Sequence, residues 1–161
     1  MKLTLNREFL LRHLFAFGVF LALGGWFAFD AFVRYPATDA RALYVSIERA
    51  EPPDGLDLAA FKAQKTASQR AMAFAVLLAA AGVGLHLLCV AAFRFEYDDG
   101  GFSVGARRYG YGDVADIDGS QWERNRILKF SAGGRRVVLD GWHHVGVDGF
   151  RRKIADGLAK Q

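Results

Sequence analysis

Two long apolar runs constrain this chain more than any other feature of its sequence. The first covers residues 14–29 and can be extended to residue 33, and the second covers residues 71–93. The second run contains no Asp, Glu, Lys or Arg, and about 20 apolar residues are enough to cross the hydrocarbon core of a bilayer as a helix. The two runs therefore predict a membrane-spanning helical hairpin.

The runs divide the chain into four segments. We expect a lead-in and first transmembrane helix over 1–36, a partly helical connector over 37–70, a second transmembrane helix over 71–93 and a small domain over 94–161. The lead-in reads as the first turns of a helix, and Pro36 is expected to stop the first span. The bulky residues Trp26 and Phe27 occupy the positions where a signal peptide has small residues, so we expect an uncleaved anchor.

The segment after Arg94 has the pattern of short strands separated by turns. We expect five antiparallel strands, at 94–97, 102–107, 112–117, 126–131 and 135–140. Apolar residues then recur at helical spacing, at Val147, Phe150, Ile154 and Leu158. The predicted fold class is therefore a membrane α-helical hairpin plus a small α+β domain that a C-terminal helix caps.

Four parts of this segment carry a family resemblance. They are the stretch FEYDDGGF at 95–102, the stretch YGDVADI at 111–117, the strand at 135–140 and the closing helix at 150–158. Together they resemble the bacterial pleckstrin-homology-like (PH-like) domains that follow membrane hairpins. The resemblance implies a cytoplasmic binding and assembly module without catalytic residues. A complete domain of that family has seven strands, so five strands indicate a trimmed version or a different small α+β unit.

Charge is close to balanced in the predicted domain, which has 12 basic and 10 acidic residues. A nucleic-acid-binding protein concentrates basic residues on one face, so we expect no nucleic-acid partner. Arg107, Arg108, Arg135 and Arg136 flank the predicted strands, and near a membrane they are candidates to contact anionic lipid or a protein partner. We expect a membrane protein partner or self-association, and no cofactor.

His86 lies inside the second apolar run, where an ionisable side chain is costly and is a functional hypothesis by default. Ala80 and Gly84 are small residues four apart, a spacing that lets helix backbones approach closely. We predict that these three residues make an intramembrane helix contact. The alternative is a small oligomeric channel or transporter built around His86.

His143 and His144, with Asp140 nearby, raise the alternative of a metal-dependent enzyme. Adjacent residues of an extended segment point to opposite sides, so this pair is poorly placed to bind one ion. We predict no metal site and no catalytic residues, and hence that the protein is not an enzyme.

Two spans place both termini on one side of the membrane. The basic residues that flank the spans do not decide the orientation, and the basic lead-in and the family resemblance favour cytoplasmic termini in a bacterial inner membrane. The expected function is to scaffold or assemble a membrane protein complex. The alternative is a module that binds anionic lipid at the membrane surface.

Overall fold

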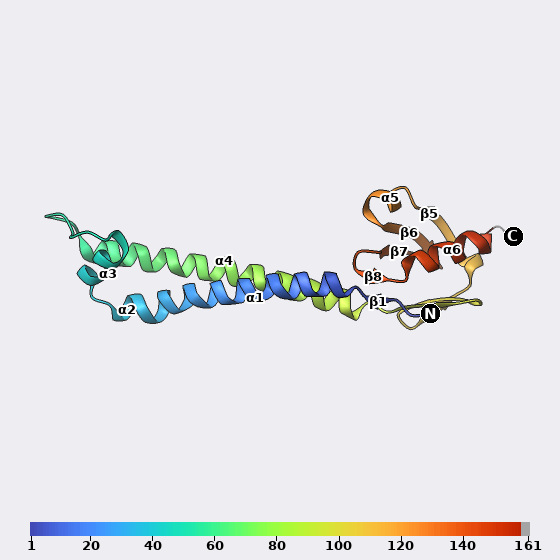
Figure 1. The fold of residues 1–161 in the computed structure, drawn as a ribbon, viewed down its shortest axis with the longest axis horizontal. Coiled ribbons are helices and arrows are strands. Elements are labelled where there is room, and N and C mark those ends of the chain that lie inside the picture. The colour runs from blue at the N-terminus through green and yellow to red at the C-terminus, as the bar shows by residue number, and fades with distance from the viewer. Residues whose placement is uncertain (159–161) are drawn as a thin grey trace. The chain divides into compact units, whose positions relative to one another are not determined.

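The structure is a computed structural model that describes residues 1–158 of the chain (Figure 1). It contains two compact units. Residues 13–86 form the first, which we call the hairpin, and residues 1–12 together with the described residues from 87 onward form the second, which we call the α+β unit. The first residues of the chain thus belong to the same unit as its C-terminal segment.

Two long apolar helices account for the predicted spans. The first runs through α1 (Arg7–Phe29), a π-helical turn η1 (Asp30–Arg34) and α2 (Tyr35–Ala37), and the second is α4 (Leu58–Ala92). Both are long and apolar enough to cross a membrane. The short helix α3 (Ala40–Glu48) lies between them, and the Asp39 carboxylate caps it by accepting from the Arg41 and Ala42 N–H groups.

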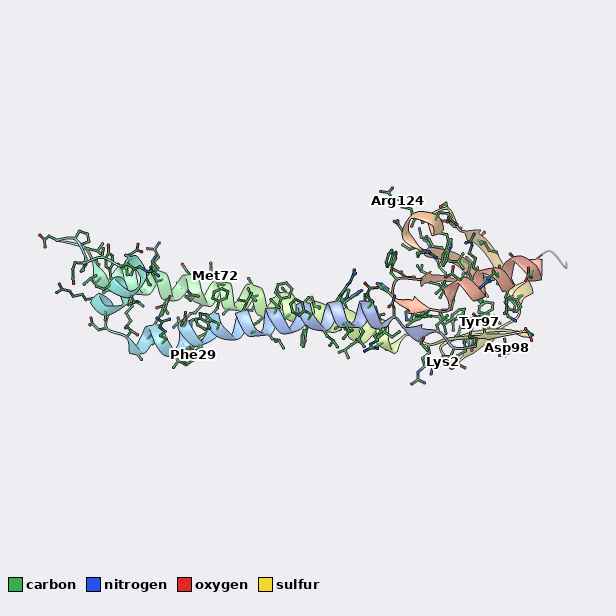
Figure 2. All side chains as sticks on the ribbon, viewed as in Figure 1. Lys2, Phe29, Met72, Tyr97, Asp98 and Arg124 are labelled. Carbon is green, nitrogen blue, oxygen red and sulfur yellow. The ribbon has the colours of Figure 1, made fainter. Side chains whose placement is uncertain are left out.

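The two helices run antiparallel within the hairpin. Gly84 of α4 lies against Phe17 of α1, while Gly24 of α1 lies against Leu77 of α4. Residues later in α1 thus contact residues earlier in α4, as antiparallel helices require. Large apolar side chains such as Phe29 and Met72 point outward from the pair and are about half exposed (Figure 2).

The first helix passes through Pro36 and ends at Ala37, so the prediction that Pro36 stops it is wrong by one residue. The π-helical turn supplies the reason. The Tyr35 N–H bonds to the Asp30 carbonyl, five residues back, which widens the helix where the proline ring enters. Because proline has no N–H to donate, it fits the end of this widened turn without leaving a donor unpaired.

Two three-stranded antiparallel sheets form the centre of the α+β unit. In the order of pairing, the first contains β2 (Phe95–Asp98), β3 (Gly101–Val104) and β4 (Arg107–Tyr109), and the second contains β5 (Val114–Asp118), β6 (Ile127–Ala132) and β7 (Arg135–Asp140). The short helix η2 (Tyr111–Asp113) connects the two sheets, and α5 (Trp122–Asn125) lies between β5 and β6. The final helix α6 (Val147–Leu158) lies beside the second sheet (Figure 1).

The predicted strand at 102–107 is in fact two strands. Gly105 adopts a φ of +64°, a left-handed conformation that glycine allows, and this closes a tight turn between β3 and β4. The predicted C-terminal helix is present as α6, with Val147, Phe150 and Ile154 buried. The side chain of Leu158, the fourth residue of the predicted apolar face, lies outside the described residues.

The first residues of the chain are extended, so the prediction of a helical lead-in is wrong before Arg7. The Leu3 N–H donates to the Phe95 carbonyl at 3.0 Å, and the Tyr97 N–H donates to the Met1 carbonyl at 2.7 Å. These bonds add residues 1–3 along the free edge of β2. Next, β1 (Thr4–Leu5) pairs with β8 (His144–Val145). The first five residues therefore bond both to β2 and to the segment that precedes α6.

An aromatic core joins both sheets to α6. Phe102 of β3 meets Phe130 of β6 at a ring-centroid distance of 5.6 Å, and Phe150 of α6 lies 5.2 Å from Phe102 and 4.7 Å from Phe95. All four rings are at most 1% exposed. Burial of four phenylalanine side chains in mutual contact is the main stabilising feature of this unit.

Candidate functional site

The four arginines predicted as contact residues lie in different surroundings. Arg108 is engaged in the structure, because its guanidinium lies 2.7 and 2.8 Å from the two carboxylate oxygens of Asp98. This contact, with the Gly100 N–H bond, holds the pKa of the Asp98 carboxyl below its ordinary value. Arg108 therefore braces the β2–β3 turn.

Because successive side chains of a strand point to opposite faces of the sheet, the other three arginines lie on different faces. Arg107 pairs directly with Val104, and Arg135 shares a strand face with buried Val137, so both project toward the inner side of their sheets. Arg136 alternates with them and projects outward. The four predicted contact arginines therefore do not form a single basic face. Arg107 and Arg135 face inward, Arg136 faces outward, and Arg108 is paired with Asp98.

A small cleft opens between β4 and β7, beside the inner pair. Its volume is about 140 Å³, and it is lined by Phe93, Val104, Tyr109 and residues 135–138. Phe93 is the first residue after α4, so the cleft lies next to the point where the second apolar helix meets the α+β unit. An apolar floor with guanidinium groups at its edge suits an amphipathic anion.

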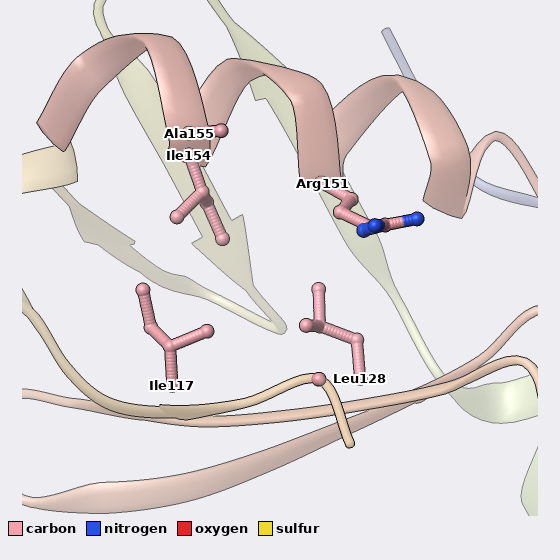
Figure 3. A pocket seen from close by; sticks show the side chains of 6 residues that line it. Ile117, Leu128, Arg151, Ile154 and Ala155 are labelled. Atoms are coloured by element: carbon pink, nitrogen blue, oxygen red, sulfur yellow. The ribbon is translucent and has the colours of Figure 1, made fainter. Parts of the chain in front are cut away.

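A second cavity lies under α6 and is lined by Ile117, Gly119, Leu128, Arg151, Ile154 and Ala155. Its volume is about 200 Å³. Figure 3 shows Ile117 and Leu128 rising from the strands toward Ile154 of the helix, with the guanidinium of Arg151 to one side. We call this cavity the α6 pocket.

A β-bulge places Ile117 in the α6 pocket. Ala115 pairs with Ser131 and Asp118 with Lys129, so β5 contains one residue more than β6 over this stretch. Asp116 absorbs the irregularity with a φ of +53°, which Asp tolerates better than most residues. The bulge shifts the alternation of β5 and turns Ile117, which is 40% exposed, toward the helix.

Arg151 is held at the rim of the α6 pocket by its neighbours. Its guanidinium lies 5.2 Å from the Trp122 ring centroid and 3.6 Å from Oε1 of Glu123. Arg151 is thus stacked on the ring of a buried tryptophan and is not freely solvated. The Glu123 side chain is 87% exposed, so an incoming carboxylate can replace it with little structural cost.

His143 and His144 pack on different aromatic residues. The His143 ring packs on Phe9 at 4.4 Å, and the His144 ring packs on Phe93 at 5.3 Å. His144 is also hydrogen-bonded to the Val90 backbone, and burial lowers the pKa of its imidazole. Within residues 1–158 no three His, Cys, Asp or Glu side chains are grouped to hold a metal ion.

The three predicted helix-contact residues lie along the α1-facing part of α4. Ala80 is 1% exposed, and a Cβ atom on Gly84 would lie 3.1 Å from the Phe17 ring. The ring of His86 lies 5.7 Å from the ring of His13 on α1, a partner that sequence reasoning missed. An antiparallel register through Gly84 and Phe17 would have predicted that pair, because it places residues near 13 opposite residues near 86.

Comparison of the chain with protein-family models, with curated proteins and with solved structures finds no match.

Proposed function

We propose that this chain is an integral membrane protein in which a two-helix anchor carries a PH-like binding module, and that the module helps to assemble or stabilise a membrane protein complex. The hairpin would restrict the module to the membrane surface and so raise its effective concentration for partners in the same membrane. The module acts by binding and has no part in bond-making chemistry.

The arrangement of strands supports the PH-like interpretation. The six strands β2–β7 form two packed sheets, and the extended residues 1–3 add a further strand at the edge of β2. The six strands of the two sheets approach the seven of the family, and β1 and β8 form a further two-stranded pair. Helix α6 then closes the core through Phe150, as the closing helix of such a domain would.

Both ends of the hairpin enter the α+β unit, which supports a shared location for them. Residues 1–12 and the stretch from Leu87 onward belong to this one unit. If α1 and α4 both cross the bilayer, the chain leaves and returns on the same side. We place the α+β unit in the cytoplasm and the helices in a bacterial inner membrane.

The α6 pocket is the observation that carries the binding proposal. It combines an apolar interior of about 200 Å³ with a single guanidinium at the rim. A cavity of that size accommodates one large aliphatic or aromatic side chain, and the guanidinium suits a carboxylate next to it. The chemistry that fits is a partner segment in which a bulky apolar residue adjoins an acidic group or a C-terminus.

Purification from native membranes tests this function. The tagged full-length protein, extracted in mild detergent, should bring a membrane partner in stoichiometric amount. Arg151→Ala should lose most of that partner, because it removes the rim charge, and Ala155→Leu should lose it by filling the rim. Arg152→Ala is the matched control, since Arg152 is the neighbouring arginine of α6 and does not line this pocket. A partner retained equally by all variants would contradict a role for the pocket.

Anionic lipid is a second candidate ligand, and the β4–β7 cleft favours it. Arg135 lines this cleft together with Phe93, directly after α4, and Arg107 pairs with Val104, another residue of the lining. If α4 spans the bilayer, this cleft is near the headgroups, where guanidinium groups attract anionic phosphates.

Thermal stability in nanodiscs separates the lipid candidate from the first proposal. Anionic lipid should raise the Tm of the full-length protein relative to zwitterionic lipid, and salt should reduce that difference. Reversal of both charges, Arg107→Glu with Arg135→Glu, should abolish it. Arg124→Glu, on α5, is the control. Arg108 is unsuitable for this test because its reversal would break the Asp98 ion pair in any lipid.

A further inference from the structure

The segment 140–145, which we call the junction loop, connects the α+β core to the ends of both long helices. The Asn6 N–H donates to the His143 carbonyl at 2.8 Å, directly before α1 begins, and the His143 ring packs on Phe9 in the first turn of α1. On the opposite side, His144 packs on Phe93 and bonds to the backbone of Val90 in the last turn of α4.

Two large apolar side chains of the junction loop are exposed. Trp142 is 57% exposed and Val145 is 54% exposed, which makes them the most exposed large apolar residues described between 93 and 156. The Trp142 backbone is fixed by the Asp140 carboxylate, which accepts from its N–H at 2.7 Å. The turn thus holds the Trp142 backbone in place while its indole remains largely exposed.

We propose that the junction loop is a membrane-contact site, in which Trp142 and Val145 enter the interfacial layer of the bilayer that holds α1 and α4. This inference rests on the proposed membrane anchoring. The loop contacts the first turn of α1 and the last turn of α4, so it lies at the two helix ends that would emerge from a bilayer if these helices span it. Tryptophan prefers that layer, because its ring is apolar and its N–H finds a polar partner among the headgroups.

The charges next to the junction loop agree with a lipid partner. Arg7 begins α1 and Arg94 follows α4 by two residues, and both are exposed. Arginines at these positions can place their guanidinium groups among lipid phosphates while the aliphatic part of the side chain lies deeper. An exposed indole next to two exposed arginines at the helix ends favours interfacial lipid as the occupant.

Tryptophan fluorescence tests this site without disturbing the core. The chain has three tryptophans: Trp26 on α1, Trp122 in the core and Trp142 in the junction loop. In nanodiscs, the signal of Trp142 is the difference between Trp26→Phe and Trp26→Phe/Trp142→Phe. The signal of Trp26 is the difference between Trp142→Phe and the same double variant. Trp122, 3% exposed, remains in every sample as the internal control.

Lipids that carry a nitroxide at a shallow or a deep acyl position then report depth. We expect the shallow nitroxide to quench Trp142 at least about twofold more strongly than the deep one, and aqueous iodide to quench it weakly, as for an interfacial indole. Strong iodide quenching of Trp142 without lipid quenching would overturn the proposal. The same data test the anchoring, because Trp26 must be quenched by lipid if α1 spans. Quenching of Trp26 alone rejects only the junction-loop site, and quenching of neither rejects the membrane anchor as well.

Discussion

Along α1 and α4 within the hairpin the buried residues are small or polar and several large aromatic rings face outward, whereas the α+β unit buries its aromatic rings. Ala73 and Ala80 of α4 are 3% and 1% exposed, while Phe15 and Phe74 are 75% and 72% exposed. In the α+β unit the phenylalanines of the sheets are the best-buried residues. Packing through small residues with apolar side chains outside is how helices associate in lipid, where lipid tails already solvate the large side chains. One chain thus contains two packing rules, each suited to a different solvent.

The largest effect is expected when one phenyl ring is removed from each region in turn, which compares the two kinds of packing. Phe102→Ala should lower the free energy of unfolding of the α+β unit by about 3–5 kcal/mol, because it leaves a cavity at the centre of the aromatic core. Phe74→Ala is the matched substitution on the hairpin and should leave that transition unchanged. Chemical denaturation in detergent, followed through Trp122 fluorescence in the Trp26→Phe/Trp142→Phe background, measures both. An equal loss from both substitutions would break the comparison.

Next in size is the effect of enlarging the helix contact. Gly24 lies against Leu77, and a Cβ there would come within 2.7 Å of the leucine side chain, whereas the space beside Gly25 is open. Gly24→Leu should destabilise the hairpin by about 1–3 kcal/mol through overpacking. Gly25→Leu should be neutral or stabilising, since leucine favours a helix. Thermal loss of helical circular dichroism in detergent compares them, and identical behaviour would show that the helices do not pack at Gly24.

A smaller effect is expected at the β-bulge. Asp116→Val should lower the stability of the α+β unit by about 1–2 kcal/mol, because a β-branched residue fits poorly at positive φ. Asp116→Gly should match or exceed the wild type. The denaturation assay used for Phe102 measures the difference, and a valine variant as stable as the glycine variant would mean that the bulge does not constrain β5.

The smallest effect is on pH dependence. Burial lowers the pKa of His144 below its ordinary value of 6.5, so the unfolded chain takes up a proton there before the folded one does. The contribution of neutral His144 to the stability of the folded α+β unit is complete above about pH 6.5, and it declines as the pH falls toward the folded-state pKa of His144. The α+β unit should therefore unfold at lower denaturant at pH 5 than at pH 7. His144→Gln, which cannot titrate, should show a smaller pH dependence, and an unchanged one would assign the titration to other groups.

Sequence patterns predicted those elements that carry their own signal. The apolar runs predict the two long helices because about 20 apolar residues in sequence have few other stable solutions. The positions of Val147, Phe150 and Ile154 predict α6 by their helical spacing. In contrast, Met1–Leu5 is too short to display a period of two, and its partner β2 is more than 90 residues away. Pairing at such a separation has no local signature.

The candidate sites were harder to predict for a related reason. Alternation along β4 and β7 distinguishes Arg107 from Arg108 and Arg135 from Arg136, yet only the pairing of the sheets shows which member of each pair lies on the inner face of its sheet. The α6 pocket depends on one residue, Asp116, whose positive φ no spacing rule indicates. A register shift of one residue reverses every later side chain of a strand, so sites that depend on bulges lie beyond pattern reasoning.

The strand formed by residues 1–5 also sets an order of events during synthesis. This stretch leaves the ribosome before both long helices, while the strands that it pairs with, β2 and β8, follow them. The α+β unit therefore cannot be completed until α4 has been made, and until then the early strand has no partner within the chain. If α1 and α4 span a membrane, a helix inserted in the wrong orientation would keep the first and later strands apart and leave the edge of β2 unpaired, so completion of the unit would require a correctly inserted hairpin.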